Sequence, residues 1–488
     1  MSEFSEAFTE LIKEKDIQVY PLVKYCNMDR STMYKIISGK RKPPSEPIFN
    51  KICDFMHLSP LEYDKFQTAY RITLMGKENY YRRRNVEDFI LSFPSESNAL
   101  LSSISDHLQM KYVGSALPSK DAFLSNQLEC NQALHHILIK EGNKHNGKIA
   151  LLLQPDHEFL FGVLANLTPD LASSPISVEH IICLSKKTQL DPDNRLYNLS
   201  YLKNILPLYI SNIAYKPYYF YDDITAHYYN HNAFSCMILT TEYAMSCTSD
   251  YSTGILHNDA QTVQAMWKLY YSYQSKCMPL FHTAASIEEY MSSDNMGQGK
   301  TSSYFIQPEP CLLPFITPQM MENVIYPHIP ERSSLLSKLQ QFVSESKERI
   351  TSPKMHYYHT REGLISFAET GRLIEIPNNF YKPFSKKERI LLLQQLLTAC
   401  HTCCYRLLKK PLNILPNNFH LCVNENSGYL LFTNGHKKEV CLIFREPSMV
   451  LTFLDYASWI SENNYLASEE ESKNFISEVI QNLSREMQ

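Results

Sequence analysis

The stretch "DRSTMYKIISGKRKPPSEP", residues 29–47, decides how the front of the chain folds. Asp29 is a good N-cap, because its side chain can accept a hydrogen bond from a free N–H of the first helical turn. Met33 and Ile36 point inward from the helix that follows, and Gly39 suits the left-handed conformation that ends a helix. A basic run and two prolines come next. The pattern predicts a short, capped helix with one exposed polar face.

Four further helices are predicted around this one, because apolar residues recur at helical spacing on both sides of it. Asn27 falls where the chain must turn sharply before the capped helix, and asparagine tolerates the left-handed conformation better than most residues. Residues 1–75 therefore have the pattern of an all-α bundle. The apolar faces of the four helices are formed by Phe4, Phe8, Leu11 and Ile12; by Leu22, Val23 and Cys26; by Ile48, Ile52, Phe55 and Met56; and by Leu61, Phe66 and Tyr70.

The capped helix leaves polar and basic side chains outside the bundle. Side chains in the amino-terminal half of a helix can reach base edges when the helix enters the major groove of DNA. A basic run without an intervening acidic residue contacts phosphates and supplies salt-dependent affinity. The candidate DNA-contacting residues are Arg30, Ser31, Thr32, Tyr34 and Lys35 on the helix, and Lys40, Arg41 and Lys42 after it.

Residues 16–43 resemble the lambda-repressor/Cro-like, or Xre-type, helix-turn-helix proteins without a gap. Ile17 stands at the apolar position before the second helix, and "GKRKP" at 39–43 is similar to the family's exit from the recognition helix. Val19 stands where the family often has a phosphate-contacting Gln, and the adjacent Gln18 is the candidate replacement. The resemblance implies a transcription regulator whose base and phosphate readers are Arg30, Ser31, Thr32 and Lys35.

The expected partner is double-stranded operator DNA, bound by a homodimer. A single module of this size buries only about 600–1,000 Å² on DNA and reads few base pairs, so two copies on a near-palindrome are expected. Residues 1–84 carry 15 Lys and Arg against 11 Asp and Glu, whereas the remaining chain carries 32 against 40. Two alternatives stay open: a bundle that contacts proteins and not DNA, and an enzyme of unknown reaction tethered by the bundle.

The body of the chain is predicted to be multidomain. A linker with helices over 76–124 precedes an α/β domain over 125–285, whose alternating helices and strands predict a mainly parallel sheet. Residues 286–345 contain six prolines and are expected to be mostly linker. Residues 346–488 predict an α+β domain, with a long helix through "CHTCCYRLL" and an antiparallel meander after it. No internal repeat is visible in the sequence.

One segment of the body is a candidate for the rim of a pocket that binds a small-molecule or peptide effector. It is "YYFYDDITAHYYNHN", over 218–232, in which carboxylates and histidines stand among tyrosines. If the segment were helical, its two histidines would share a face and could bind a metal ion. An aromatic-lined or an ordinary loop is the expected alternative, because a strand precedes it. The candidate rim residues are Tyr219, Tyr221, Asp222, His227 and His231.

Catalytic, cofactor-binding and membrane-spanning signals are absent from the sequence. Neither G-x-S-x-G nor H-E-x-x-H occurs, and the cysteines of "CHTCC" at 400–404 lack a second ligand pair, so core packing is expected there. No apolar run approaches the roughly 20 residues that span a bilayer. The expectation is a cytoplasmic regulator without catalytic residues, metal or cofactor.

Overall fold

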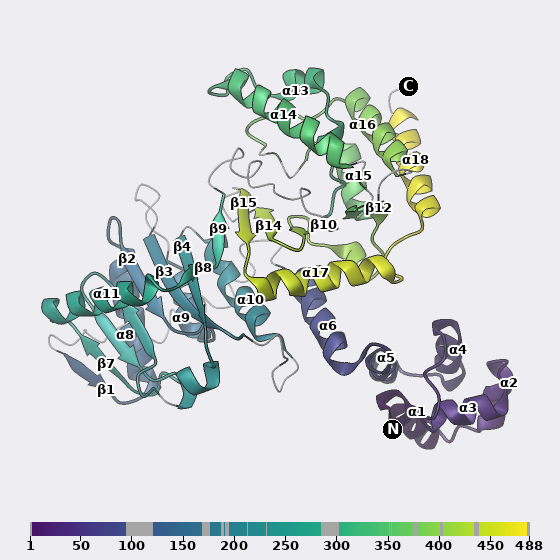
Figure 1. The fold of residues 1–488 in the computed structure, drawn as a ribbon, viewed down its shortest axis with the longest axis horizontal. Coiled ribbons are helices and arrows are strands. Elements are labelled where there is room, and N and C mark those ends of the chain that lie inside the picture. The colour runs from purple at the N-terminus through teal and green to yellow at the C-terminus, as the bar shows by residue number, and fades with distance from the viewer. Residues whose placement is uncertain are drawn as a thin grey trace. The chain divides into compact units, whose positions relative to one another are not determined.

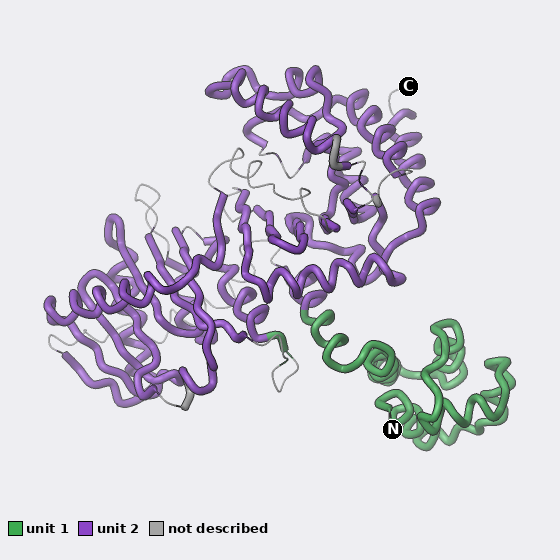
Figure 2. Tube along the Cα trace, in the orientation of Figure 1, with its two compact units in different colours: residues 1–85, 189–196 green, residues 86–188, 197–488 purple. Residues whose placement is uncertain are grey.

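The computed structural model divides into two compact units (Figure 2). Unit 1 comprises 1–85 together with 189–196, and unit 2 comprises 86–188 and 197–488. The structure describes residues 2–93, 121–167, 176–186, 190, 195–211, 213–230, 232–284, 302–350, 352, 354–373, 376, 378–400, 404–433 and 439–485.

Unit 1 is a bundle of helices around an aromatic core. Its helices are α1 Glu3–Glu14, α2 Val19–Tyr25, α3 Arg30–Ile37, α4 Glu46–Met56 and α5 Pro60–Met75, and α6 Lys77–Leu91 begins in it. Capping boxes start α1 and α5, where a serine and the side chain three residues later satisfy each other's backbone N–H. The largest core side chains are Phe4, Phe8, Phe49, Phe66 and Tyr70, and Phe4 stacks on Phe66 with ring centroids 5.0 Å apart.

Unit 2 contains two mixed sheets (Figure 1). We call the part over 121–279 lobe 1. Its eight strands run in the order β1-β7-β6-β5-β2-β3-β4-β8. They are β1 Ala122–Leu124, β2 Lys148–Leu152, β3 Ile176–Leu184, β4 Ile213–Tyr221, β5 Cys236–Leu239, β6 Ala244–Cys247, β7 Gly254–His257 and β8 Met278–Pro279. Its helices are α8 Gln127–Gly142, α9 Glu158–Ala165, α10 Tyr197–Ile210, the π-helix η1 Thr225–Asn230 and α11 Ala260–Gln274.

Lobe 2, over 281–485, holds seven strands in the order β12-β11-β10-β13-β14-β15-β9. They are β9 Phe281–Thr283, β10 Ser303–Ile306, β11 Met355–His359, β12 Cys404–Leu407, β13 His420–Val423, β14 Gly428–Thr433 and β15 Glu439–Phe444. Its helices are η2 Leu313–Phe315, α13 Pro318–Val324, α14 Arg332–Ile350, α15 Arg361–Thr370, α16 Lys386–Ala399, η3 Leu412–Ile414, α17 Pro447–Glu462 and α18 Glu469–Arg485. The antiparallel meander expected here is confirmed by the pairing of β13 with β14 and of β14 with β15.

The two lobes have the same topology. The strand orders β1-β7-β6-β5-β2-β3-β4 and β9-β15-β14-β13-β10-β11-β12 correspond strand by strand along the chain. The directions agree as well: β2, β3 and β4 are parallel, as are β10, β11 and β12, and the other pairs are antiparallel. The structure therefore contains an internal repeat that the sequence does not display.

Three expectations about the body differ from the structure. The sheet of lobe 1 is mixed and not mainly parallel, because only the β2–β3 and β3–β4 pairs are parallel and the other pairs are antiparallel. The segment over 286–345 is no linker in its described part: β10 lies between β11 and β13 in the second sheet, and α14 contributes to a large hydrophobic cluster. The long helix expected through "CHTCC" ends at Ala399, and Cys404 begins β12. Most of the expected linker over 76–124, namely 94–120, lies outside the described residues.

Candidate nucleic-acid interface

The turn between α2 and α3 sets the direction of α3. Asn27 has φ 52°, the left-handed conformation that its place in the sequence predicted. The amide of Met28 donates to the carbonyl of Val23 at 3.1 Å, and the side chain of Met28 packs against the bundle core. The amide of Asn27 also donates, to the carbonyl of Lys24 at 3.1 Å, so the turn is held by backbone hydrogen bonds and a core contact.

The amino terminus of α3 is capped by Asp29. Its Oδ2 accepts from the amide of Thr32 at 2.9 Å and from the hydroxyl of Ser31 at 2.8 Å. The hydrogen bond from the Thr32 amide is the main reason why the pKa of Asp29 is lowered, and that from Ser31 adds to it. Because Ser31 donates its only proton to the cap, it can meet DNA only as an acceptor.

The outer face of α3 presents long polar side chains, while its inner face is closed. Met33 and Ile36 are 0% and 2% exposed, whereas Arg30, Tyr34 and Lys35 are exposed. The guanidinium carbon of Arg30 lies 5.6 Å from the centroid of the Tyr34 ring, close enough for a cation–π contact. The ring therefore limits the positions that Arg30 can take before it meets a ligand.

The basic run after α3 is folded back against the helix. Nη1 of Arg41 donates to the hydroxyl of Thr32 at 3.1 Å, and the Arg41 amide donates to the carbonyl of Lys35 at 3.1 Å. Lys40 and Lys42 are exposed. Gln18 is also exposed, at the start of α2, and its side chain makes no cap hydrogen bond. All nine residues predicted to contact DNA thus lie in unit 1, on α3, its exit and the start of α2.

Gly39→Ala is expected to reduce the free energy of opening α3 by about 1–2 kcal/mol, because alanine is strained at positive φ and the site is crowded. Gly39 has φ +71°, and a Cβ there would lie 2.8 Å from Oγ of Ser5. Hydrogen–deuterium exchange of the α3 amides measures this. Gly76→Ala is the matched control, since Gly76 has φ +85° with nothing within 4 Å. If Gly39→Ala and Gly76→Ala reduced the exchange protection of their adjoining helices equally, crowding against Ser5 would have no role.

The tyrosines predicted at a pocket rim lie where lobe 1 contacts lobe 2. The ring centroids of Tyr219 and Tyr221 are 5.4 Å apart, and the hydroxyl of Tyr221 donates to Oε1 of Glu446. Burial, with the neighbouring Glu446 adding to it, raises the pKa of Tyr221. Asn198 Nδ2 donates to Ser448 Oγ at 2.8 Å beside them. The Tyr221 hydroxyl is therefore occupied by a contact between lobes.

The remaining rim candidates are only partly described. His227 lies in η1, and its Nδ1 is 3.3 Å from Oδ2 of Asp222. His231 lies outside the described residues, so the pair of histidines stays a prediction. Within the described ranges, no group of three or more His, Cys, Asp or Glu could hold a metal ion.

Lobe 2 contains a buried polar row that the sequence did not reveal. Gln307 and His359 directly follow the paired residues Ile306 and Tyr358. His420 directly precedes Leu421, the other partner of Ile306, and the three polar residues are 3%, 1% and 2% exposed. Nε2 of His420 lies 3.6 Å from Oε2 of Glu309. Among the described residues, neither ring nitrogen of His359 has a hydrogen-bond partner. Burial lowers the pKa of His359 to about 3. The three polar residues are far apart in the sequence, so the row becomes visible only once the strand pairing is known.

The same row in lobe 1 is apolar. The corresponding pairing of Leu152 with Ile181 and with Met237 places Leu153, Ile182 and Cys236 at the equivalent positions, all buried. The fold thus accepts an apolar row here, and lobe 2 departs from it although burying polar groups costs free energy unless they find partners.

Comparisons with known proteins add little to this geometry. No family model matches the chain, and no curated protein matches it. TrmBL2, an archaeal chromatin protein whose structure shows a novel mode of DNA binding, is 10% identical over 56% of this chain and 98% of its own, with a TM-score of 0.22. The phosphatidylserine synthase of Haemophilus influenzae Rd KW20 is 9% identical over 79% and 96%, also with a TM-score of 0.22. Neither likeness carries an argument about fold or function.

Proposed function

We propose that this protein is a sequence-specific DNA-binding transcription regulator of the lambda-repressor/Cro-like, helix-turn-helix type. The observation that carries the proposal is the outer face of α3, where Arg30, Tyr34 and Lys35 project from a helix whose inner face is fully packed. A rigid helix with exposed donors at its amino-terminal half is the element that reads base edges in the major groove.

The proposed roles follow from the contacts of each side chain. Arg30 and Lys35 are free to read bases, and Tyr34 contributes its ring as an apolar contact surface. Lys40 and Lys42 neutralise phosphates without choosing a sequence. Arg41 also contacts a phosphate, from a position held by Thr32.

Unit 2 is proposed to supply the dimer surface and an effector site. One helix reads few base pairs, so a second copy related by a two-fold axis supplies the other half-site. An effector acts on such a protein only through different affinities for its DNA-competent and DNA-incompetent arrangements. No helix in the described part of the chain is long and apolar enough to cross a membrane.

The test is enrichment of sheared genomic DNA by the full-length protein, followed by sequencing. Arg30→Ala/Lys35→Ala is the test variant, and Lys13→Ala/Lys65→Ala, which removes two exposed charges from α1 and α5, is the matched control. A few sharp, two-fold-symmetric sites are expected with the wild type and with the control, and their loss is expected in the test variant.

Diffuse enrichment of DNA that is equal for the wild type and both variants would show that unit 1 attracts DNA without sequence preference. Absence of enrichment in all three would make unit 1 a protein-binding bundle. Either result would overturn the proposal.

A further inference from the structure

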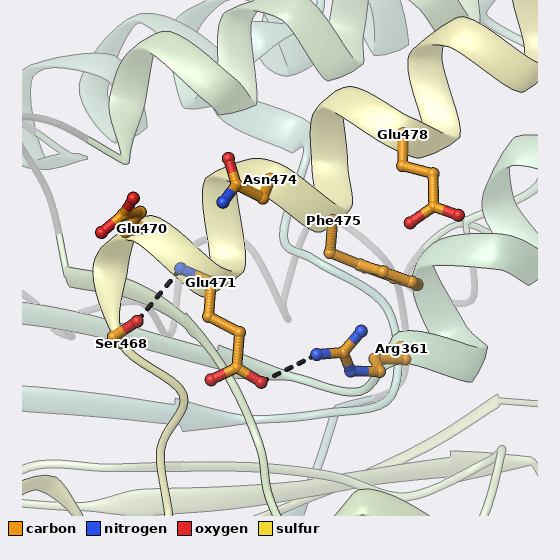
Figure 3. A pocket seen from close by; sticks show the side chains of 7 residues that line it. All are labelled: Arg361, Ser468, Glu470, Glu471, Asn474, Phe475 and Glu478. Atoms are coloured by element: carbon orange, nitrogen blue, oxygen red, sulfur yellow. Dashed lines mark hydrogen bonds and ion pairs between the residues drawn. The ribbon is translucent and has the colours of Figure 1, made fainter.

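Two adjoining cavities run along one side of α18 in lobe 2. The first, of 390 Å³, lies between α15 and the amino-terminal half of α18 (Figure 3). The second, of 290 Å³, continues toward the carboxyl-terminal end of α18. Both are lined by Phe475 and Glu478, so together they form one groove, here called the α18 groove. From Glu470 to Leu483 it is about 20 Å long at the helical rise of 1.5 Å per residue.

The floor of the α18 groove is apolar in the second cavity, whereas among the residues that line the first cavity only Phe475 is apolar. Phe475, Val479 and Leu483 recur every four residues and therefore line one stripe of α18. Ile365 of α15 lies on the opposite side and is 39% exposed, and Ala368 lies one turn further along α15. An extended apolar stripe between two helices is the surface against which a further helix packs.

Three cations line the α18 groove, Arg361, Lys386 and Arg389, and the two arginines are engaged within the protein. Nη2 of Arg361 is 2.9 Å from Oε1 of Glu471, and its guanidinium lies 4.4 Å from the Phe475 ring centroid. Figure 3 shows Glu471 reaching down from α18 to this arginine. Arg389 donates to the carbonyls that end α15, those of Ala368 and Glu369, at 2.7 and 2.8 Å. The charges of Arg361 and Arg389 are therefore already paired with groups of this chain.

Carboxylates on the rim of the α18 groove are unengaged. Glu369, Glu470 and Glu478 are exposed, and the structure places no hydrogen-bond or ion-pair partner at their side chains among its described residues. In Figure 3 Glu470 and Glu478 stand at opposite ends of the first cavity. An occupant therefore meets an apolar floor between negative rims.

We propose that the α18 groove binds an amphipathic helix of a partner protein, with an apolar stripe flanked by lysines or arginines. The apolar stripe of the partner would cover Ile365, Phe475 and Val479, and its cations would pair with Glu470 and Glu478. Burial of the apolar stripe supplies affinity, and complementary rim charges supply orientation and speed of association. The proposal is independent of DNA binding, because it uses no residue of unit 1.

Two other occupants fit less well. A linear polyamine would satisfy the carboxylates but would gain nothing from the apolar floor. A second copy of this chain would need an exposed basic amphipathic helix. Among the described helices of unit 2 the most aromatic exposed face, on α11 with Leu269, Tyr271 and Tyr273, carries only Lys268 within the helix.

The experiment measures binding of a fluorescein-labelled synthetic helix of about 14 residues to the full-length protein by anisotropy. The probe has leucines at helical spacing and lysines beside them, and a scrambled peptide of the same composition has no apolar face. Glu470→Lys/Glu478→Lys is the test variant. Glu425→Lys/Glu462→Lys makes the same change of charge at exposed positions outside the groove. Ile365→Gln tests the floor.

The probe is expected to bind the wild type and the control variant alike, and about tenfold more weakly to the charge-reversed groove. Ile365→Gln is expected to weaken binding several-fold, and the scrambled peptide should bind about tenfold more weakly than the probe. Equal binding of both peptides would show attraction for any polycation and overturn the proposal. The proposal would also fail if Glu470→Lys/Glu478→Lys and Glu425→Lys/Glu462→Lys weakened probe binding equally. It would fail as well if the wild type self-associated and Glu470→Lys/Glu478→Lys abolished that self-association.

Discussion

Arg30→Ala is expected to weaken binding to the operator by about 1–3 kcal/mol and to relax sequence preference at the base it contacts. The reason is that Arg30 is exposed at the first turn of α3, where an arginine can donate two hydrogen bonds to one guanine. Its affinity for unrelated duplex should fall much less. Fluorescence anisotropy with the enriched operator, and with a scrambled duplex of equal length, measures both quantities.

Lys42→Ala provides the contrast, because Lys42 is exposed after the helix and is proposed to meet only phosphate. It should weaken operator and scrambled duplex alike, and the slope of log affinity against log salt should become shallower by about one. If Arg30→Ala and Lys42→Ala changed specificity equally, the division into base readers and phosphate contacts would be wrong.

Acidification from about pH 7.5 to 5.5 is expected to destabilise lobe 1 more than lobe 2. Burial lowers the pKa of His157 to about 4 and that of His180 to about 3, both in lobe 1. In lobe 2 it lowers the pKa of His359 to about 3. Smaller decreases of the pKa of His135 and His356, also caused by burial, add one group to each lobe.

The sign follows from proton binding. An unfolded histidine takes up a proton near its ordinary pKa of about 6.5, whereas these folded histidines stay neutral until the pH approaches their lowered values. The unfolded state therefore binds more protons below about pH 6.5, and stability decreases as the pH falls through that window. Each group contributes about 1.4 kcal/mol between pH 7.5 and 5.5, so the pair His157 and His180 removes about 3 kcal/mol from lobe 1.

The two tryptophans of the chain allow the lobes to be followed separately. Trp267 lies in lobe 1 and Trp459 in lobe 2, so Trp459→Phe leaves a reporter of lobe 1 and Trp267→Phe a reporter of lobe 2. Urea unfolding of both variants, followed by tryptophan fluorescence at several pH values, gives the free energy of unfolding of each lobe. Its slope against pH is the quantity compared. His359→Leu removes a titrating group that has no hydrogen-bond partner among the described residues, and it should flatten only the slope of lobe 2. Equal slopes in both lobes, unchanged by His359→Leu, would show that the buried histidines do not cause the pH dependence of stability.

Local elements could be predicted from the sequence because their causes are local. The cap by Asp29 and the left-handed Asn27 each depend on a few adjacent residues, and the structure confirms both. The meander after β13 follows from alternating apolar runs and short turns, and it is confirmed as well. Contact of Arg30 or Lys42 with DNA stays a prediction.

The arrangement of strands could not be predicted in the same way. Periodicity shows that a segment is a strand but not which strand it pairs with, so β5, β6 and β7 could not be recognised as antiparallel members of the first sheet. Prolines suggested a linker over 286–345, yet β10 lies in that segment and pairs with both β11 and β13. The polar row of lobe 2 was missed for the same reason, because Gln307, His359 and His420 are far apart in the sequence.

The shared topology of the two lobes has an evolutionary consequence. Two consecutive lobes with corresponding strand orders are what duplication and fusion of one ancestral coding segment would produce. After such a fusion each copy is free to change while the other preserves the original packing. Leu153 and Ile182 in one copy, and Gln307 and His359 at the equivalent places in the other, would then show how far the interiors of the two copies have diverged.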